Sequence, residues 1–224
     1  MSGLRALFNS LADLVVPVVC LVCGELDEPL CGPCESRLLS SGSVRRTVAV
    51  PGHSPVAVHA AVVAGPELLR IVTAFKDAGR SDLTPLLGRL MRTHLPPAEL
   101  ATTDVVVAVP QSRRAYMRRG WDPIRTLARA TGYPLTQVLE VHARHVDQTT
   151  LTREARWHNV SQTMRVTPTA RGIVRGRSVI IVDDVITTGA TFSEAARALC
   201  AVGVRDVRGV ALASVERAPR QTHR

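Results

Sequence analysis

Two adjacent carboxylates behind an apolar run are the side chains of this chain best suited to chemistry. The run 179–182 (Val-Ile-Ile-Val) is typical of a buried strand, and Asp183 and Asp184 follow it directly. Ligands of open α/β sheets bind outside the carboxyl ends of strands. Backbone N–H groups at a helix N-terminus form an anion site. We therefore expect a phosphate cradle in the loop that leads into the next helix, at Thr187, Thr188, Gly189, Ala190 and Thr191.

The order of these features carries the prediction, since each of them alone has a simpler interpretation. An Asp-Asp pair is often a solvated turn, and Thr-Gly-Ala-Thr is often only a helix cap. Together, a strand, an acid pair, a phosphate loop and a helix favour a site in which carboxylates meet sugar hydroxyls or a hard cation such as Mg²⁺.

A basic loop follows a second predicted strand, 105–109. It carries Arg113, Arg114, Arg118 and Arg119 within seven positions. A guanidinium group can donate two parallel hydrogen bonds to phosphate oxygens, although most arginine runs are only solvated loops. Lys76 adds either a further charge for a ligand or a cap for its own helix C-terminus.

Four cysteines near the start of the chain have the spacing of a structural metal site. Cys20, Cys23, Cys31 and Cys34 form C-x₂-C-x₇-C-x₂-C, in which each pair can bring two thiolates to one tetrahedral ion. Zinc is favoured over two disulfides, which require an oxidising compartment, and over an iron–sulfur cluster. Cys200 stands apart and is interpreted as a small buried apolar residue.

The bulk properties indicate a globular protein with anionic partners. Of the 224 residues, 46% are hydrophobic and 21% charged, which argues against global disorder. The formal charge of +9 favours phosphorylated small molecules or nucleic acid. The apolar stretch 11–22 is too short and too interrupted to span a membrane, and the cytoplasm is the expected compartment.

Alternating strands and helices predict an α/β fold with a parallel sheet and flanking helices. The expected units are an N-terminal helix with the cysteine knuckle (1–40), a main domain (55–215) and a disordered tail (216–224), with residues 40–54 as a linker or loop. Expected strands lie at 56–63, 105–109, 179–182 and 207–213, and expected helices at 66–78, 83–94, 123–130 and 191–202.

Several of these motifs together resemble the ComF family, a phosphoribosyltransferase-like group associated with natural competence. The resemblance covers nearly the whole chain from Cys20 to about Ala213. Besides the cysteines and the acid pair with its loop, it rests on Phe75-Lys76, Gly79-Arg80, Val109-Pro110, Arg118-Arg119-Gly120-Trp121, Gln148, Leu151-Thr152, Arg156 and Asn159. Asp122 and Pro123 replace two amides that are usual in the family.

The resemblance implies a type I phosphoribosyltransferase-like fold that binds PRPP, or a related ribose-5-phosphate, with Mg²⁺. In such proteins the two acids contact the ribose hydroxyls, the Thr/Gly loop holds the 5′-phosphate, and the loop after Pro110 faces the pyrophosphate. The polar segment 142–159 would then be the counterpart of the mobile loop that covers the substrate. If the protein is an enzyme, it is a glycosyltransferase that transfers the phosphoribosyl group to a nitrogen acceptor.

Other functions stay open at the level of sequence. The protein could bind single-stranded DNA in DNA uptake, using the phosphate site as a grip with Trp121 and Tyr116 as stacking residues. It could also be an inactive scaffold held by zinc. No residue identifies the acceptor, and the start Met1-Ser2-Gly3 lacks the nucleophilic cysteine that glutamine hydrolysis requires.

Overall fold

The computed structural model describes residues 18–40, 42–94, 104–132, 135–141 and 163–215. The predicted N-terminal helix, the covering segment 142–159 and the tail 216–224 lie outside these residues. Within the described ranges, no helix has the length and apolar character needed to cross a bilayer.

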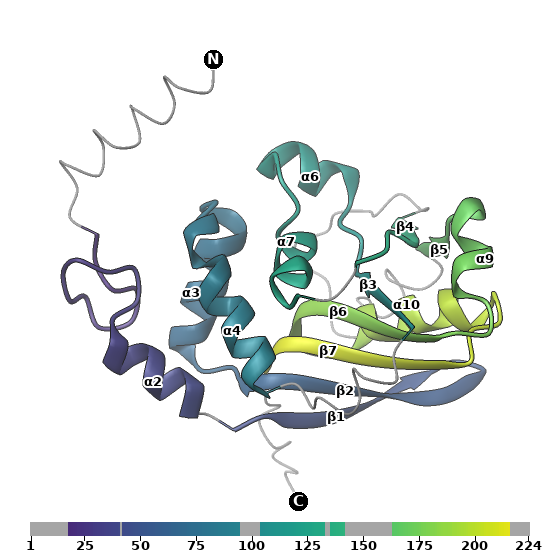
Figure 1. Cartoon of the computed structure of the whole chain (residues 1–224), viewed down its shortest axis with the longest axis horizontal. Coiled ribbons are helices and arrows are strands. Elements are labelled where there is room, and N and C mark those ends of the chain that lie inside the picture. Colours follow the sequence, from purple (N-terminus) through teal and green to yellow (C-terminus); the bar gives the residue numbers. More distant parts are fainter. Residues whose placement is uncertain (1–17, 41, 95–103, 133–134, 142–162, 216–224) are drawn as a thin grey trace, which may run out of the picture.

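A five-stranded mixed sheet forms the centre of the molecule (Figure 1). Its order is β1-β2-β7-β6-β3, and all neighbouring pairs except β1–β2 are parallel. Buried Val, Ile and Ala fill these strands, as expected for a sheet that is covered on both faces. The parallel sheet predicted from the sequence is thus confirmed. The strands are β1 (Val44–Val50), β2 (His53–Val63), β3 (Val105–Ala108), β6 (Ser178–Ile186) and β7 (Asp206–Ser214).

The linker predicted at residues 40–54 is wrong, because the edge strand β1 and the start of β2 together occupy more than half of it. Val48 and Val50 are buried, while the residues between them and before them are more exposed. This alternation is the strand period, but Ser, Gly and Pro on either side concealed it. The sheet therefore begins at Val44, and the division of the chain into domains stays a prediction.

Helices cover the sheet on both sides. On one face α3 (Pro66–Asp77), α4 (Thr84–His94) and α7 (Pro123–Ala130) pack together, and on the other face lies α10 (Ala190–Cys200) (Figure 1). Helices α4 and α7 approach closely at Gly88, where a Cβ atom would lie 2.8 Å from that of Ala130. The short elements η1 (Ser81–Leu83), β4 (Leu139–Val141), β5 (Met164–Val166), η2 (Pro168–Ala170) and α9 (Arg171–Val174) complete the described domain.

The cysteine segment docks against this domain through α2 (Gly32–Ser40). Its buried residues Cys34 and Leu38 belong to the same hydrophobic cluster as α3 and α4. Arg89 of α4 donates to Glu35 at 2.7 and 3.0 Å, and Arg37 pairs with Glu67 of α3. Because these pairs are largely exposed, apolar burial contributes most to the docking.

Candidate functional site at the carboxyl edge of the sheet

The acid pair lies in the last part of strand β6, beyond the end of its neighbour β3. The last residue pair between the two strands is Ala108–Val182, whereas β6 stays paired with β7 as far as Ile186–Ser214. The predicted strand 179–182 was therefore too short, because it stopped at the first charged residue. Asp183 and Asp184 have no strand partner on the β3 side, and this opening creates the site.

Asp184 forms an ion pair that joins two distant parts of the chain. The Nζ atom of Lys76, at the end of α3, lies 2.5 Å from Oδ2 of Asp184, whose side chain is only 6% exposed. The other carboxylate oxygen accepts a hydrogen bond from the N–H of Val185 at 2.7 Å. A ligand or cation that approaches Asp184 therefore meets its carboxylate together with the ammonium group of Lys76.

Asp183 has a different environment, because adjacent strand residues point to opposite faces. It is buried, and its Oδ1 accepts the N–H of Asp184 at 2.9 Å. Burial, followed by the negative charge of Asp184, raises the pKa of Asp183 well above its usual range. The two acids are thus not equivalent, and Asp184 is the one that reaches the charged surroundings of Lys76.

The predicted phosphate loop connects β6 to the N-terminus of α10. Gly189 has a φ of +83°, and a Cβ atom there would lie 2.9 Å from Val48. This position thus requires glycine for both backbone strain and space. Thr188 accepts the N–H of Ala190 at 3.3 Å through its hydroxyl, while Thr187 is exposed. Thr191 follows in the first turn of α10, so all five predicted residues surround one helix N-terminus.

Lys76 is part of a cationic hollow that the sequence did not predict as a unit. The ends of α3 and α6 (Arg113–Arg119) meet there: Arg119 donates to Asp77 at 2.8 and 3.1 Å, and the rings of Phe75 and Trp121 form an edge-to-face pair at 5.0 Å. The hollow holds about 540 Å³. Three cations line it against one carboxylate, and its charged residues are Lys76, Asp77, Arg118 and Arg119.

One signal in the sequence could have identified Lys76. It is the single lysine among the 28 cationic residues of the chain, all others being arginine. Because the chain uses arginine at every other cationic position, the lysine at position 76 indicates a requirement for a small, flexible ammonium group there.

The basic loop predicted after β3 is largely the helix α6. Ser112 caps it by accepting the N–H of Ala115, and Gly120 ends it in the left-handed conformation. Arg113 and Arg114 are exposed in its first turn. Among the described residues, no ion pair connects Arg113 with the acid pair, whereas Arg118 and Arg119 border the hollow beside Lys76.

A wider hollow of about 740 Å³ lies at the opposite end of α10, away from the phosphate loop. Arg171, Arg175, Arg197 and Cys200 are among its lining residues. None of its lining residues belongs to the acid pair or to the loop 187–191, so this hollow is not part of the carboxyl-edge site.

The four cysteines converge as their spacing predicts. All four sulfur atoms lie within 4.8 Å of one another, and those of Cys23 and Cys31 are 3.5 Å apart, too far for a disulfide bond. The first pair lies on a tight turn closed by a bridge between Val19 and Leu26, and the second pair lies at the start of α2. The cluster is therefore positioned to bind a metal ion.

The thiols of this cluster differ in their tendency to ionise. Burial opposes ionisation of Cys20, but hydrogen bonds from the backbone of Cys23, Cys31 and Val22 lower its pKa to about 6. For Cys34, burial and the neighbouring sulfurs raise the pKa to about 12. The Cys20 thiolate thus forms readily and the Cys34 thiolate does not, unless a bound cation offsets the repulsion between the sulfurs.

Comparison with known proteins finds similarity to phosphoribosyltransferase domains and to DNA utilization proteins. A phosphoribosyl transferase domain model matches residues 115–223. The DNA utilization protein YhgH of Escherichia coli K12 is 29% identical over 152 residues, and that of Shigella flexneri is 28% identical. The matched region is 64% of this chain, and the chain spans 65% of the length of these curated relatives.

Two solved structures are also similar in part. They are the allosteric regulatory enzyme of purine biosynthesis and the glutamine phosphoribosylpyrophosphate amidotransferase of B. subtilis in complex with ADP and GMP. Each is 25% identical and covers 59% of this chain, with TM-scores of 0.35 and 0.36 and with 25% and 26% of its own length matched.

The sheet, the acid pair with its loop and the matched domain define a phosphoribosyltransferase-like protein. Its N-terminal cysteine cluster and its similarity to the YhgH proteins accord with the resemblance to the ComF family.

Proposed function

We propose that the carboxyl-edge site binds PRPP, or a related ribose-5-phosphate, together with Mg²⁺. The observation that carries the proposal is the Lys76–Asp184 ion pair at the open end of β6, directly before a Thr/Gly loop and a helix N-terminus. This arrangement offers a carboxylate for ribose hydroxyls or a hard cation, and backbone N–H groups for a phosphate.

Each part of the ligand has a matching region of the site. Thr187 to Thr191 would hold the 5′-phosphate, and Asp184 the ribose hydroxyls. The cationic hollow with Lys76, Arg118 and Arg119 matches the charge of a pyrophosphate, which Arg113 and Arg114, as predicted from the sequence, would approach from the first turn of α6. On ligand binding, Lys76 would leave Asp184 for a phosphate oxygen.

If the protein is catalytic, a nitrogen lone pair attacks C1 of the ribose while the bond from C1 to the pyrophosphate oxygen breaks. Positive charge then develops on the sugar and negative charge on the leaving group. Asp184 would stabilise the first, and Lys76 with the arginines the second, whereas Asp183, which the sequence paired with Asp184, points to the other face of the sheet. Mg²⁺ would supply further charge stabilisation at the pyrophosphate when bound.

Calorimetric titration of the metal-loaded protein with PRPP, with and without Mg²⁺, tests this proposal. We expect saturable binding that needs Mg²⁺ and that Asp184→Asn weakens by at least about tenfold, because a charged hydrogen-bond partner is lost. Asp104→Asn is a matched control on the far edge of the sheet, where Asp104 pairs with Arg205. No binding by the wild type, or equal binding by Asp184→Asn, would contradict the proposal.

For the cysteine cluster we propose a structural zinc ion. Four thiolates around one tetrahedral ion would leave no open position for a substrate, which is typical of structural rather than catalytic zinc. The reduced thiols that such a site needs accord with the cytoplasmic location predicted from the sequence. Metal analysis of the purified protein, with one equivalent of zinc expected, tests this assignment.

Binding of single-stranded DNA is a second candidate function. The observation in its favour is α6, which buries none of its residues and presents Arg113, Arg118, Tyr116 and Met117. The printed name of the curated relatives, DNA utilization protein, points in the same direction.

The salt dependence of oligonucleotide binding tests this second function. The affinity of a single strand should fall steeply with salt, and Arg113→Ala with Arg118→Ala should reduce that slope. Arg119 is less suitable for the test than the sequence suggests, since its side chain is 14% exposed and pairs with Asp77. A flat response to salt would remove this candidate.

A further inference from the structure

A separate hollow of about 310 Å³ opens at the carboxyl end of β3. Its walls are the loop after β3, the start of α7 and the segment 135–139, which is bridged to β3 through Leu135 and Val106. Its volume is at the lower end of the range for ligand pockets, roughly 300–1,000 Å³. It shares none of its lining residues with the cationic hollow beside Lys76.

Two side chains that line this hollow each carry a buried polar atom that has no hydrogen-bond partner in the described part of the chain. These atoms are Oε1 of Gln111 and Nε of Arg125. The amide of Gln111 donates from Nε2 to the carbonyl oxygen of Trp121 at 2.9 Å, so its other end is left as an acceptor. Proteins seldom bury such atoms unpaired, because their lost hydration is not regained. These atoms therefore indicate a ligand that offers one donor and one acceptor.

The charge of the hollow indicates an uncharged ligand. Asp122 and Arg125 are its charged lining residues and balance each other, whereas the hollow beside Lys76 carries an excess of cations. Ala108, Val109 and Leu139 add apolar surface. The balanced charges would give a phosphate little electrostatic stabilisation here. A small flat ring with polar edges would match both the apolar and the polar parts of the lining.

We propose that this hollow binds a nucleobase. A nucleobase is uncharged and planar and carries N–H donors together with ring-nitrogen or carbonyl acceptors at its edge. The hollow also borders the carboxyl-edge site, since Ala108 pairs with Val182, two residues before Asp184. The inference rests on the proposed function, which supplies two sources for the base: a free base as phosphoribosyl acceptor, or a base within single-stranded nucleic acid.

Direct titration with defined probes tests the proposal. Adenine, hypoxanthine, cytosine and uracil are titrated into the metal-loaded wild-type protein, alone and with PRPP and Mg²⁺, and an eight-nucleotide single strand is titrated in parallel. We expect one of these probes to bind saturably. Arg125→Met should weaken that binding about tenfold or more, because it removes the buried donor. Gln111→Met should have a similar effect through the lost acceptor.

Arg129→Met is the matched control, because Arg129 lies exposed on the same helix and outside the hollow. Unchanged PRPP affinity in Arg125→Met would separate this site from the carboxyl-edge site, so the two proposals can fail independently. If Arg125→Met weakens the binding of a free base, the hollow is an acceptor pocket. If it weakens only the binding of the oligonucleotide, the hollow is a nucleic-acid pocket. Failure of every probe to bind, or equal binding by Arg125→Met and the wild type, would overturn the proposal.

Discussion

The cysteine cluster and the carboxyl-edge site differ in how the chain builds them. All four cysteines lie in one short segment, and a turn and the start of α2 bring their sulfur atoms together. Lys76 and Asp184 come from elements far apart in sequence and meet only because α3 covers the face of the sheet to which Asp184 points. The cysteine cluster can be predicted from residue spacing alone, whereas predicting the carboxyl-edge site requires knowledge of how distant elements pack.

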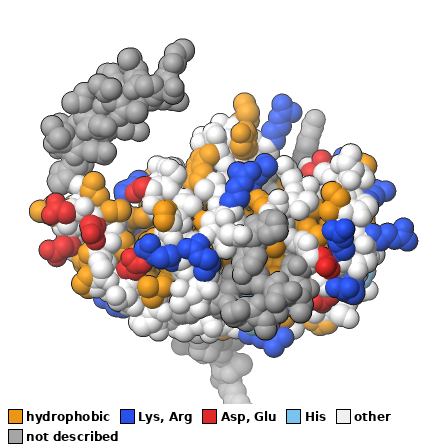
Figure 2. Space-filling model, in the orientation of Figure 1, with side chains coloured by type: hydrophobic (Ala, Val, Ile, Leu, Met, Phe, Trp, Pro, Cys, Tyr) orange, Lys and Arg blue, Asp and Glu red, His pale blue; other side chains and the backbone are white. Residues whose placement is uncertain are grey.

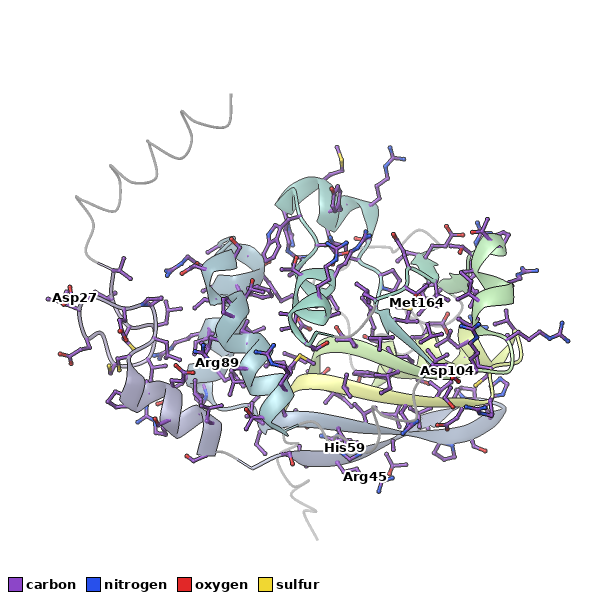
Figure 3. The ribbon with its side chains drawn as sticks, in the orientation of Figure 1. Asp27, Arg45, His59, Arg89, Asp104 and Met164 are labelled. Carbon is purple, nitrogen blue, oxygen red and sulfur yellow. The ribbon has the colours of Figure 1, made fainter. Side chains whose placement is uncertain are left out.

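The two regions also differ in charge. The segment 18–40 carries four carboxylates and one arginine, although the whole chain has a net charge of +9. Figure 2 shows acidic side chains gathered over the cysteine end of the molecule and basic ones over the rest of this face. In Figure 3, Asp27 lies at that acidic end and Arg89 faces it from α4, beside the docked segment. We therefore expect changes at the cysteines to affect stability and changes at the acid-pair edge to affect anion binding.

Loss of a cysteine should give the largest effect on stability. Cys34→Ser should abolish stoichiometric zinc and destabilise the protein by about 3 kcal/mol or more, because metal binding and local folding are coupled. For a chain of this size that corresponds to a fall in Tm of roughly 6–12 °C. Metal content and thermal unfolding measure the two effects. Cys200→Ser, outside the cluster, should retain the metal, and an equal loss of Tm in both variants would contradict the structural role of the site.

Lys76→Met should weaken ligand binding at the carboxyl-edge site without affecting the cysteine cluster. We expect PRPP affinity to fall about tenfold or more, because the variant removes a charged partner of the ligand phosphates, while zinc stays bound. Titration calorimetry with Mg²⁺ measures the affinity. Arg70→Met, an exposed cation on the same helix, is the control. If both variants bound PRPP like the wild type, Lys76 would have only a structural role.

At the carboxyl-edge site, Thr188→Val should lower PRPP affinity less than Lys76→Met does. The side chain keeps its shape but loses the hydroxyl that accepts the N–H of Ala190 and that could donate to a phosphate. The affinity for PRPP should fall about three- to tenfold, the usual range for one neutral hydrogen bond. Thr73→Val, exposed on α3, should leave it unchanged.

The smallest effect should be the pH-dependent stability of Asp183→Asn. The pKa of Asp183 is raised in the folded protein by burial and by the charge of Asp184, so the folded state binds the proton more tightly than the unfolded chain. Stability from this group is thus complete below about pH 4, its ordinary pKa, and is lost as pH rises from there toward the raised pKa. The difference in Tm between Asp183→Asn and the wild type should shift in favour of the variant with rising pH. A difference that is constant from pH 4 to 8 would contradict this assignment.

The sequence predicted the elements of the fold more reliably than the contacts of the site. Buried runs such as 105–109 and capped helices such as 123–130 depend on local patterns, and both were found close to their predicted bounds. The helix α6 was missed because it buries none of its residues and so has no apolar face to detect.

The contacts at the site depend on how distant elements pack. The Lys76–Asp184 pair, the contact of Arg119 with Asp77 and the buried polar atoms beside α7 exist only once these helices lie on the sheet. Residue type and spacing therefore predicted the candidates for the site, but not which cations lie next to the acid pair.

Because Lys76 is the only lysine, its amine can be followed individually, which gives the most direct test of the carboxyl-edge site. The rate at which a small acylating reagent modifies Lys76 in the metal-loaded protein would be measured by peptide mass spectrometry at increasing PRPP, with and without Mg²⁺. We predict a saturable decrease in this rate that needs Mg²⁺, because the ammonium group becomes engaged with the bound phosphates. A modification rate that is independent of PRPP at every concentration would contradict the binding of PRPP at this site.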